Sequence, residues 1–115
     1  AILQKWKPDA VAIEKLFFNS NQKTAIQVAE ARGVILLAAQ KAGVSISEYT
    51  PLQVKQAVTG YGQAQKPQVM EMTKRLLCLN QMPKLDDTCD ALAMAICHGQ
   101  AAGSMLRRTM LSGRM

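Results

Sequence analysis

Asp9-Ala-Val-Ala-Ile-Glu14 is a short apolar run that ends in a carboxylate, a pattern typical of a buried β-strand. The stretch Val44-Ser-Ile-Ser-Glu-Tyr49 alternates apolar and polar side chains, which predicts a second strand. Between them, apolar side chains recur at helical spacing from Asn21 to Ala42, and Gly43 is suited to end that helix. Strand, helix and strand in this order form a βαβ unit, so we expect both strands to lie parallel in one sheet.

The long predicted helix has one apolar face, whose members recur every three or four positions: Ile26, Ala29, Gly33, Leu36 and Leu37. The small residues here permit close packing, either inside the domain or across a dimer. A last helix is predicted from about Asp86, with an inward face of Ala91, Leu92, Ala95 and Ile96. We expect residues 1–104 to form the domain and 105–115 a basic, Met-rich tail that is poorly ordered or only partly helical.

Three shorter helical segments complete the pattern, within residues 1–7, 50–57 and 67–79. Thr50-Pro51 is a typical helix start, because proline is well tolerated in the first turn. The two glycines of Thr59-Gly-Tyr-Gly62 predict a turn. Two parallel strands give too little sheet for several helices to cover, so the sequence predicts an α/β fold whose sheet lacks strands.

Composition narrows the class of protein. The chain has 115 residues, 49% of them hydrophobic, which is enough for one domain and argues against disorder. No apolar run approaches the ~20 residues that span a bilayer, and no secretory signal pattern opens the chain, so we expect a soluble, intracellular protein. Three cysteines without a C-x-x-C pair argue against disulfides and zinc, and predict three buried thiols.

The net charge is +6, from 14 Lys and Arg against 8 Asp and Glu. A basic domain of this size can bind nucleic acid through its phosphates, although the same charge also serves solubility.

Four carboxylates are candidates for chemistry. Glu14 ends the first predicted strand, where α/β sheets commonly place functional groups. Asp86, Asp87 and Asp90 open the last helix, with Asp87 and Asp90 one turn apart on the same face. Stabilisation of the helix start explains Asp86 or Asp87, but it explains Asp90 less well. If Glu14 and the aspartates converge, they form an all-oxygen site suited to Mg²⁺ or Mn²⁺.

Aromatic and basic residues near these carboxylates suggest a DNA surface. Phe17 and Phe18 follow the first strand, where one of them could pack beneath the long helix or stack on unpaired bases. Lys55 and Lys66 flank the glycine turn. They belong either to an ordinary solvated face or to a phosphate-binding rim around the acidic site.

Five motifs, in order and with matching spacing, resemble the RuvC family of bacterial Holliday-junction resolvases. They are Ala12-Ile-Glu-Lys-Leu-Phe-Phe18, Ala31-Arg-Gly-Val34, Gln53-Val-Lys-Gln-Ala57, Gly60-Tyr-Gly62 with Lys66, and Asp87-Thr-Cys-Asp-Ala-Leu-Ala93. Each alone is weak, but together they are specific, and the resemblance covers roughly residues 1 to 100.

The resemblance implies an RNase H-like fold and Mg²⁺-dependent paired nicking of four-way DNA junctions, with Mn²⁺ as a possible substitute. It places the catalytic and metal-binding role on Glu14, Asp87 and Asp90. Some members of the family carry His at the position of Asp87, and Asp86 is then the helix cap. DNA contacts fall on Phe17, Lys55 and Lys66.

The resemblance also implies the protein's setting. It implies a homodimer in which the helix from Asn21 to Ala42 lies at the interface, and a branch-migration helicase complex as partner. It implies the bacterial cytoplasm and no membrane association.

The chain departs from the family pattern at its start. The family opens with a strand carrying an aspartate in a Gly-Ile-Asp-Pro-Gly-type motif, followed by two more strands, and none of these is found in the sequence. We therefore expect a truncated RNase H-like fold that begins inside the first helix. Two hypotheses follow: the chain alone is catalytically inactive, and it self-associates through the bare edge of the strand from Asp9 to Glu14.

Two other functions stay open from the sequence alone. One is a non-catalytic module that binds DNA or dimerises, which metal-dependent cleavage would distinguish from a nuclease. The other is an unrelated α/β domain for a small ligand, which a failure to bind DNA at low salt would favour.

Overall fold

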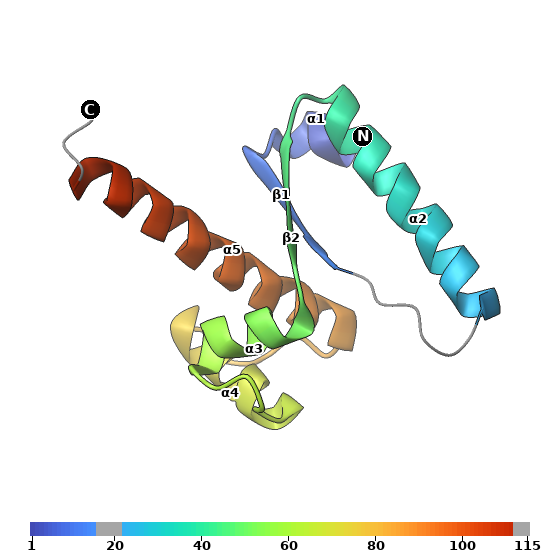
Figure 1. Ribbon diagram of the computed structural model, residues 1–115. Coiled ribbons are helices and arrows are strands. Elements are labelled where there is room, and N and C mark those ends of the chain that lie inside the picture. Colours follow the sequence, from blue (N-terminus) through green and yellow to red (C-terminus); the bar gives the residue numbers. More distant parts are fainter. Residues whose placement is uncertain (16–21, 112–115) are drawn as a thin grey trace. The chain divides into compact units, whose positions relative to one another are not determined.

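The computed structural model describes residues 1–15 and 22–111 of the chain (Figure 1). The elements follow one another as α1 (Ile2–Trp6), β1 (Ala10–Glu14), α2 (Gln22–Lys41), β2 (Ser45–Tyr49), α3 (Pro51–Thr59), α4 (Lys66–Leu76) and α5 (Asp86–Leu111). Every strand and helix predicted from the sequence is present. The chain divides into two compact units, Ala1–Glu48 and Tyr49–Met115.

The first unit is the predicted βαβ arrangement. Strands β1 and β2 pair in a two-stranded sheet and run in the same direction, joined by α2 (Figure 1). Gly43 ends α2 as expected, because its φ of 71° lies in the left-handed region that glycine adopts without strain. The Val44 amide then donates to the Ala39 carbonyl at 3.0 Å, and the chain turns directly into β2.

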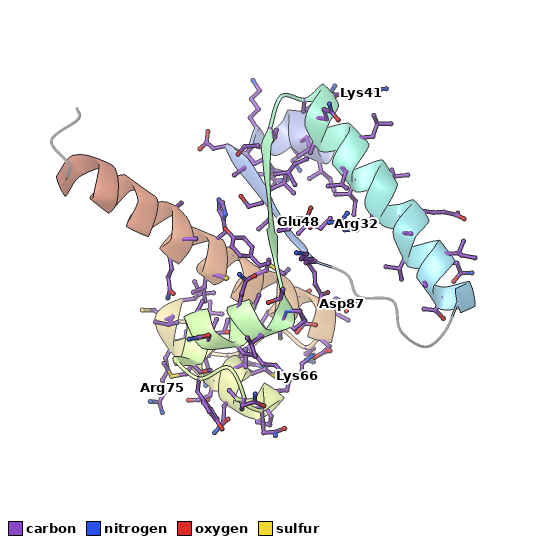
Figure 2. The ribbon with its side chains drawn as sticks, in the orientation of Figure 1. Arg32, Lys41, Glu48, Lys66, Arg75 and Asp87 are labelled. Carbon is purple, nitrogen blue, oxygen red and sulfur yellow. The ribbon has the colours of Figure 1, made fainter. Side chains whose placement is uncertain are left out.

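The side of α2 that packs within the first unit is not its predicted apolar face. Ala39 is buried, and Arg32 reaches from α2 to Glu48 of β2 with its Nη2 3.0 Å from Oε2 (Figure 2). Of the predicted apolar face, Leu36 is half-buried, but the other four residues are exposed: Ile26, Ala29, Gly33 and Leu37. Of the two alternatives for this face, packing inside the domain is not seen among the described residues, and packing across a dimer stays a prediction. Apolar spacing also cannot reveal that an arginine paired with a strand residue lies on the packed side.

In the second unit, α3 is fixed at both of its ends. Thr50 caps its start: the Thr50 hydroxyl accepts from the Gln53 amide at 3.1 Å, and the Gln53 side chain accepts from the Thr50 amide at 2.8 Å. This reciprocal capping, followed by Pro51, is the expected helix start. Gly60 ends the helix with a φ of 80°. The chain then turns through Gly62, where a Cβ atom would lie 3.0 Å from Leu52 Cδ1.

Helices α3, α4 and α5 pack against one another around a core of small side chains. Among the residues of this unit whose side chains the structure describes, the buried ones are Val58, Ala64, Thr73, Cys89, Ala93 and Cys97. The Thr73 hydroxyl is satisfied within α4, where it donates to the Val69 carbonyl at 2.7 Å. Small residues let the helices approach closely, and this packing fixes the start of α5 beside the start of α4.

Three expectations for the second unit need correction. The buried residues of α5 among those described are Cys89, Ala93 and Cys97; of the predicted inward face, Leu92 and Ile96 are half-buried, whereas Ala91 and Ala95 are exposed. Cys78 is exposed, so two of the three thiols are buried rather than all of them.

Helix α4 ends at Leu76 instead of Leu79. Cys78, just beyond it, has a φ of 55°, a left-handed conformation that helices do not continue through.

Helix α5 runs without a break across residue 104 to Leu111. Helix therefore covers much of the predicted tail, and the domain boundary at residue 104 stays a prediction. Within the residues that the structure describes, no helix is long and apolar enough to cross a membrane.

Candidate metal centre

Three aspartates gather at the start of α5. Asp86 and Asp87 lie in the first turn and Asp90 one turn later, so the helix places all three on one end. Each offers a carboxylate oxygen, and these oxygens lie within 4.8 Å of one another. All three side chains are exposed and accessible to an ion from solvent. The predicted pair of Asp87 and Asp90 is thus brought together, and Asp86 joins it.

The donor set fits a hard divalent cation. Mg²⁺ and Mn²⁺ prefer carboxylate oxygen to nitrogen or sulfur, and this cluster offers oxygen alone. Ligand oxygens on opposite sides of Mg²⁺ are about 4.2 Å apart, since each lies about 2.1 Å from the ion. The observed spacing, within 4.8 Å, is of the same order as this span and is therefore compatible with carboxylates of this cluster sharing an ion.

Lys66 lies against this cluster. Its Nζ is 2.6 Å from Asp86 Oδ2 and 3.1 Å from Asp90 Oδ1. Figure 2 shows Lys66 and Asp87 in the same part of the second unit. The hydrogen bond to Asp86, followed by that to Asp90, raises the pKa of the Lys66 ammonium above its ordinary value. The Lys66 side chain beside the cluster is therefore a protonated ammonium at neutral pH.

The start of α4 holds Lys66 in this position. Lys66 is the first residue of the helix and Pro67 the second. The Gln68 side chain accepts from the Gln65 amide at 2.9 Å, and the Gln68 amide donates back to the Gln65 carbonyl at 3.0 Å. The spacing Gln-x-x-Gln thus fixes the backbone on either side of Lys66.

The other predicted site residues lie elsewhere. Glu14 is exposed at the end of β1, in the first unit, whereas the aspartates belong to the second, so their convergence stays a prediction. Phe17 falls outside the described residues. Lys55 is half-buried on α3, in the same unit as Lys66.

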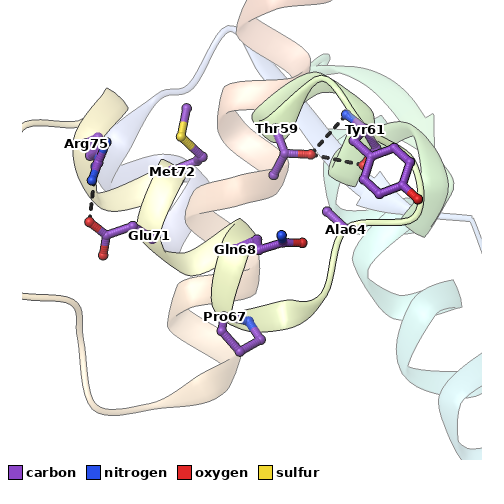
Figure 3. Close-up of a pocket in the computed structure, with 8 residues that line it drawn as sticks. All are labelled: Thr59, Tyr61, Ala64, Pro67, Gln68, Glu71, Met72 and Arg75. Atoms are coloured by element: carbon purple, nitrogen blue, oxygen red, sulfur yellow. Dashed lines mark hydrogen bonds and ion pairs between the residues drawn. The ribbon is translucent and has the colours of Figure 1, made fainter.

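A pocket of about 470 Å³ lies between the turn after α3 and helix α4 (Figure 3). Tyr61 and Thr59 line it on the turn side, with the Thr59 hydroxyl accepting from the Tyr61 amide at 3.1 Å. On the helix side, Arg75 Nε is 3.1 Å from Glu71 Oε1. Sequence reasoning missed this pocket, because it depends on how the turn packs against α4.

His98 on α5 has a specific partner in the structure. The Tyr49 hydroxyl and His98 Nδ1 are 2.7 Å apart, and the two rings meet edge-on with centroids 5.8 Å apart. The pair ties the end of β2 to α5 within the second unit. The sequence could not predict this contact, since the two residues are 49 positions apart.

The model of one protein family matches residues 1–98 of the chain: "Crossover junction endodeoxyribonuclease RuvC". The match includes β1, the start of α4 and the acidic start of α5. The chain belongs to the RuvC family.

Curated RuvC proteins agree along most of the chain. The protein from Halothermothrix orenii is 63% identical over 100 residues, which are 87% of this chain and 61% of that protein. The protein from Syntrophomonas wolfei is 59% identical over 98 residues, 85% of this chain and 57% of that protein. The chain thus spans about 60% of the length of these RuvC relatives.

Two solved structures share the fold. A structure of Thermus thermophilus RuvC is 40% identical, with a TM-score of 0.82 over 90% of this chain and 62% of that one. T. thermophilus RuvC in complex with Holliday junction substrate has a TM-score of 0.83 at 40% identity, over 88% of this chain and 61% of that one. The RNase H-like α/β fold expected for the RuvC family is confirmed.

Proposed function

We propose that this chain is the acidic, DNA-contacting part of a metal-dependent RuvC endonuclease that resolves four-way DNA junctions by paired nicking. The observation that carries the proposal is the oxygen cluster of Asp86, Asp87 and Asp90 at the start of α5 in a chain of the RuvC family. The complex of T. thermophilus RuvC with a Holliday junction substrate supports the choice of DNA.

Asp87, Asp90 and Glu14 are the proposed ligands for Mg²⁺, with Mn²⁺ as its substitute. When bound, such ions activate a water molecule and stabilise the leaving 3′ oxygen of a phosphodiester. The chain's own residues position the DNA. Lys55 and Lys66 contact the backbone phosphates, and Phe17 stacks on bases opened near the crossover.

The proposed assembly is a homodimer that works with a branch-migration helicase complex in the bacterial cytoplasm. The exposed apolar residues of α2 support an interface there: Ile26 is 58% exposed, Val34 69% and Leu37 54%. Isolated surface apolar residues are common, but several on one helix favour a partner surface. Light scattering over a range of concentrations tests this, because a chain that stays monomeric at high concentration contradicts the dimer.

The decisive experiment compares a mobile four-way junction with a linear duplex of equal length. Binding is measured in Ca²⁺ and nicking in Mg²⁺, for the chain and its Asp90→Asn variant. Glu71→Gln is the matched control, because it removes an exposed carboxylate of the same unit outside the cluster. Junction-selective binding supports the proposal, and equal weak binding to both DNAs contradicts it.

The same experiment tests whether this chain is catalytically inactive alone. Binding without nicks supports that hypothesis. Symmetric nicks that Asp90→Asn abolishes and Glu71→Gln does not would contradict it, and would show that the carboxylates of this chain are sufficient for cleavage. Loss of binding together with nicking in Asp90→Asn would instead assign Asp90 a structural role.

A further inference from the structure

One ammonium group is shared between two of the clustered carboxylates. Lys66 Nζ contacts Asp86 at 2.6 Å and Asp90 at 3.1 Å, so it lies closer to the residue that the RuvC resemblance leaves outside the ligand set. These side chains come from two different helices, α4 and α5. About half of the Lys66 side-chain surface is exposed, so solvent and solutes reach the contact.

The contact involves one of the two carboxylate oxygens of a proposed metal ligand. Asp90 Oδ1 accepts from Lys66, while Asp90 is also one of the proposed ligands. A divalent ion on this carboxylate and an ammonium 3.1 Å from it repel each other, because both are cations at nearly the same place. Asp86 gives the ammonium a second anchor, so it can leave Asp90 and still stay beside the cluster.

We propose that Lys66 is an internal cation of this cluster, that a divalent ion displaces its ammonium from Asp90, and that the displaced ammonium then binds a DNA phosphate. The inference rests on the proposed metal and DNA functions. It assigns Asp86 a role of its own, as the residue that retains Lys66 at the site. It also couples the binding of the two ligands. A bound metal ion frees Lys66 to contact a DNA phosphate, and bound DNA in turn raises the affinity for the metal ion.

The first test measures Mn²⁺ binding by the chain in the absence of DNA, using electron paramagnetic resonance to count free Mn²⁺. Lys66→Met removes the competing cation, and we expect Mn²⁺ to bind about three- to tenfold more tightly, as two exposed ion pairs are lost. Lys74→Met is the matched control, with the same charge change in the same helix. No ion pair of Lys74 is found among the described residues, so a change of less than about twofold is expected there.

Lys66→Arg separates charge from packing. Because arginine keeps the cation, its Mn²⁺ affinity should stay close to that of the unchanged chain. Unchanged or weaker Mn²⁺ binding by Lys66→Met overturns the inference and leaves the metal site intact. Asp90→Asn tests the site itself: if this variant binds Mn²⁺ as well as the unchanged chain does, the proposed metal function fails, and the inference with it.

The second test measures junction binding against salt, in EDTA and in Ca²⁺. Each phosphate contact adds about one unit to the slope of log affinity against log salt concentration. We expect Lys66→Met to lower that slope by about one in Ca²⁺ and to leave it nearly unchanged in EDTA. An equal loss in both conditions would mean that Lys66 reaches phosphate without any displacement, which contradicts the coupling.

Discussion

The two units of the chain bury their side chains to different degrees. In the second unit, six residues from three helices and the turn form a shared core: Val58, Ala64, Thr73, Cys89, Ala93 and Cys97. In the described part of the first unit, Ala39 alone reaches that degree of burial. There, the ion pair of Arg32 with Glu48 joins α2 to β2.

Because of this difference in burial, the proposed metal ligands lie in units of different expected stability. Asp87 and Asp90 are attached to a unit with its own packed core, whereas Glu14 ends a strand of a unit whose apolar side chains remain largely exposed. Local stability follows buried apolar contact, so the second unit should open less often than the first. Substitutions in both units test that expectation.

A leucine placed at a buried alanine in each unit should have the largest effect on stability. Ala93→Leu overpacks the core of the second unit and should lower its free energy of unfolding by about 2 kcal/mol. Ala39→Leu should loosen only the packing of α2 in the first unit. Hydrogen exchange of the α5 and α2 amides distinguishes the two outcomes.

Ala95→Leu is the control for this pair, because Ala95 is exposed on α5 and its change should stay within about 0.5 kcal/mol. If Ala39→Leu reduces the protection of α5 as much as Ala93→Leu does, the two units unfold together and the contrast between them is lost.

Replacing a glycine that has a positive φ should change the free energy of unfolding by a smaller amount in both units. Gly43→Ala in the first unit and Gly60→Ala in the second each force alanine into the left-handed region, at a cost of about 1 kcal/mol. Gly99→Ala should act in the opposite direction: Gly99 lies inside α5 with no atom within 4 Å of a built Cβ, so alanine should stabilise by about 0.5 kcal/mol. Urea denaturation measures all three, and destabilisation by Gly99→Ala would contradict the helix described here.

The smallest effect is on thiol ionisation. Burial raises the pKa of Cys97 above its ordinary value of 9.0. As pH rises, this thiol ionises in the unfolded chain before it ionises in the folded chain. The stability that the protonated thiol contributes to the folded state is therefore present below pH 9.0 and is lost as pH rises toward and through the raised pKa. Exposed Cys78 should react with iodoacetamide well before Cys97 at pH 8 to 9. Equal rates would show that the core of the second unit opens freely.

The elements of this fold could be predicted from the sequence, but their packed faces could not. Pro51, Gly43 and Gly60 mark helix ends because their backbone preferences are local. Which face of α5 is buried depends on tertiary packing. Ala91, Ala93 and Ala95 are equally apolar, so nothing in the sequence distinguishes the buried one from its exposed neighbours.

In the candidate site, too, local features could be predicted from the sequence and tertiary contacts could not. Asp87 and Asp90 are one turn apart on a helix, and the sequence alone predicts their proximity. The partners of Lys66 depend on how α4 packs against α5, and no pattern in the chain indicates them. The convergence of Glu14 with the aspartates joins the two units, so it is a prediction that cleavage and metal-binding experiments have to test.

The place of Lys66 at the very start of α4 has one more consequence. The peptide dipoles of a helix add up to about half a positive charge at its first turn, which repels a cation there. Asp86 is the first residue of α5, where the same effect favours an anion. The Lys66 ammonium is therefore attracted by the carboxylates of another helix and repelled by its own. The Lys66 side chain can therefore exchange one anionic partner for another without a change in the backbone at the start of α4.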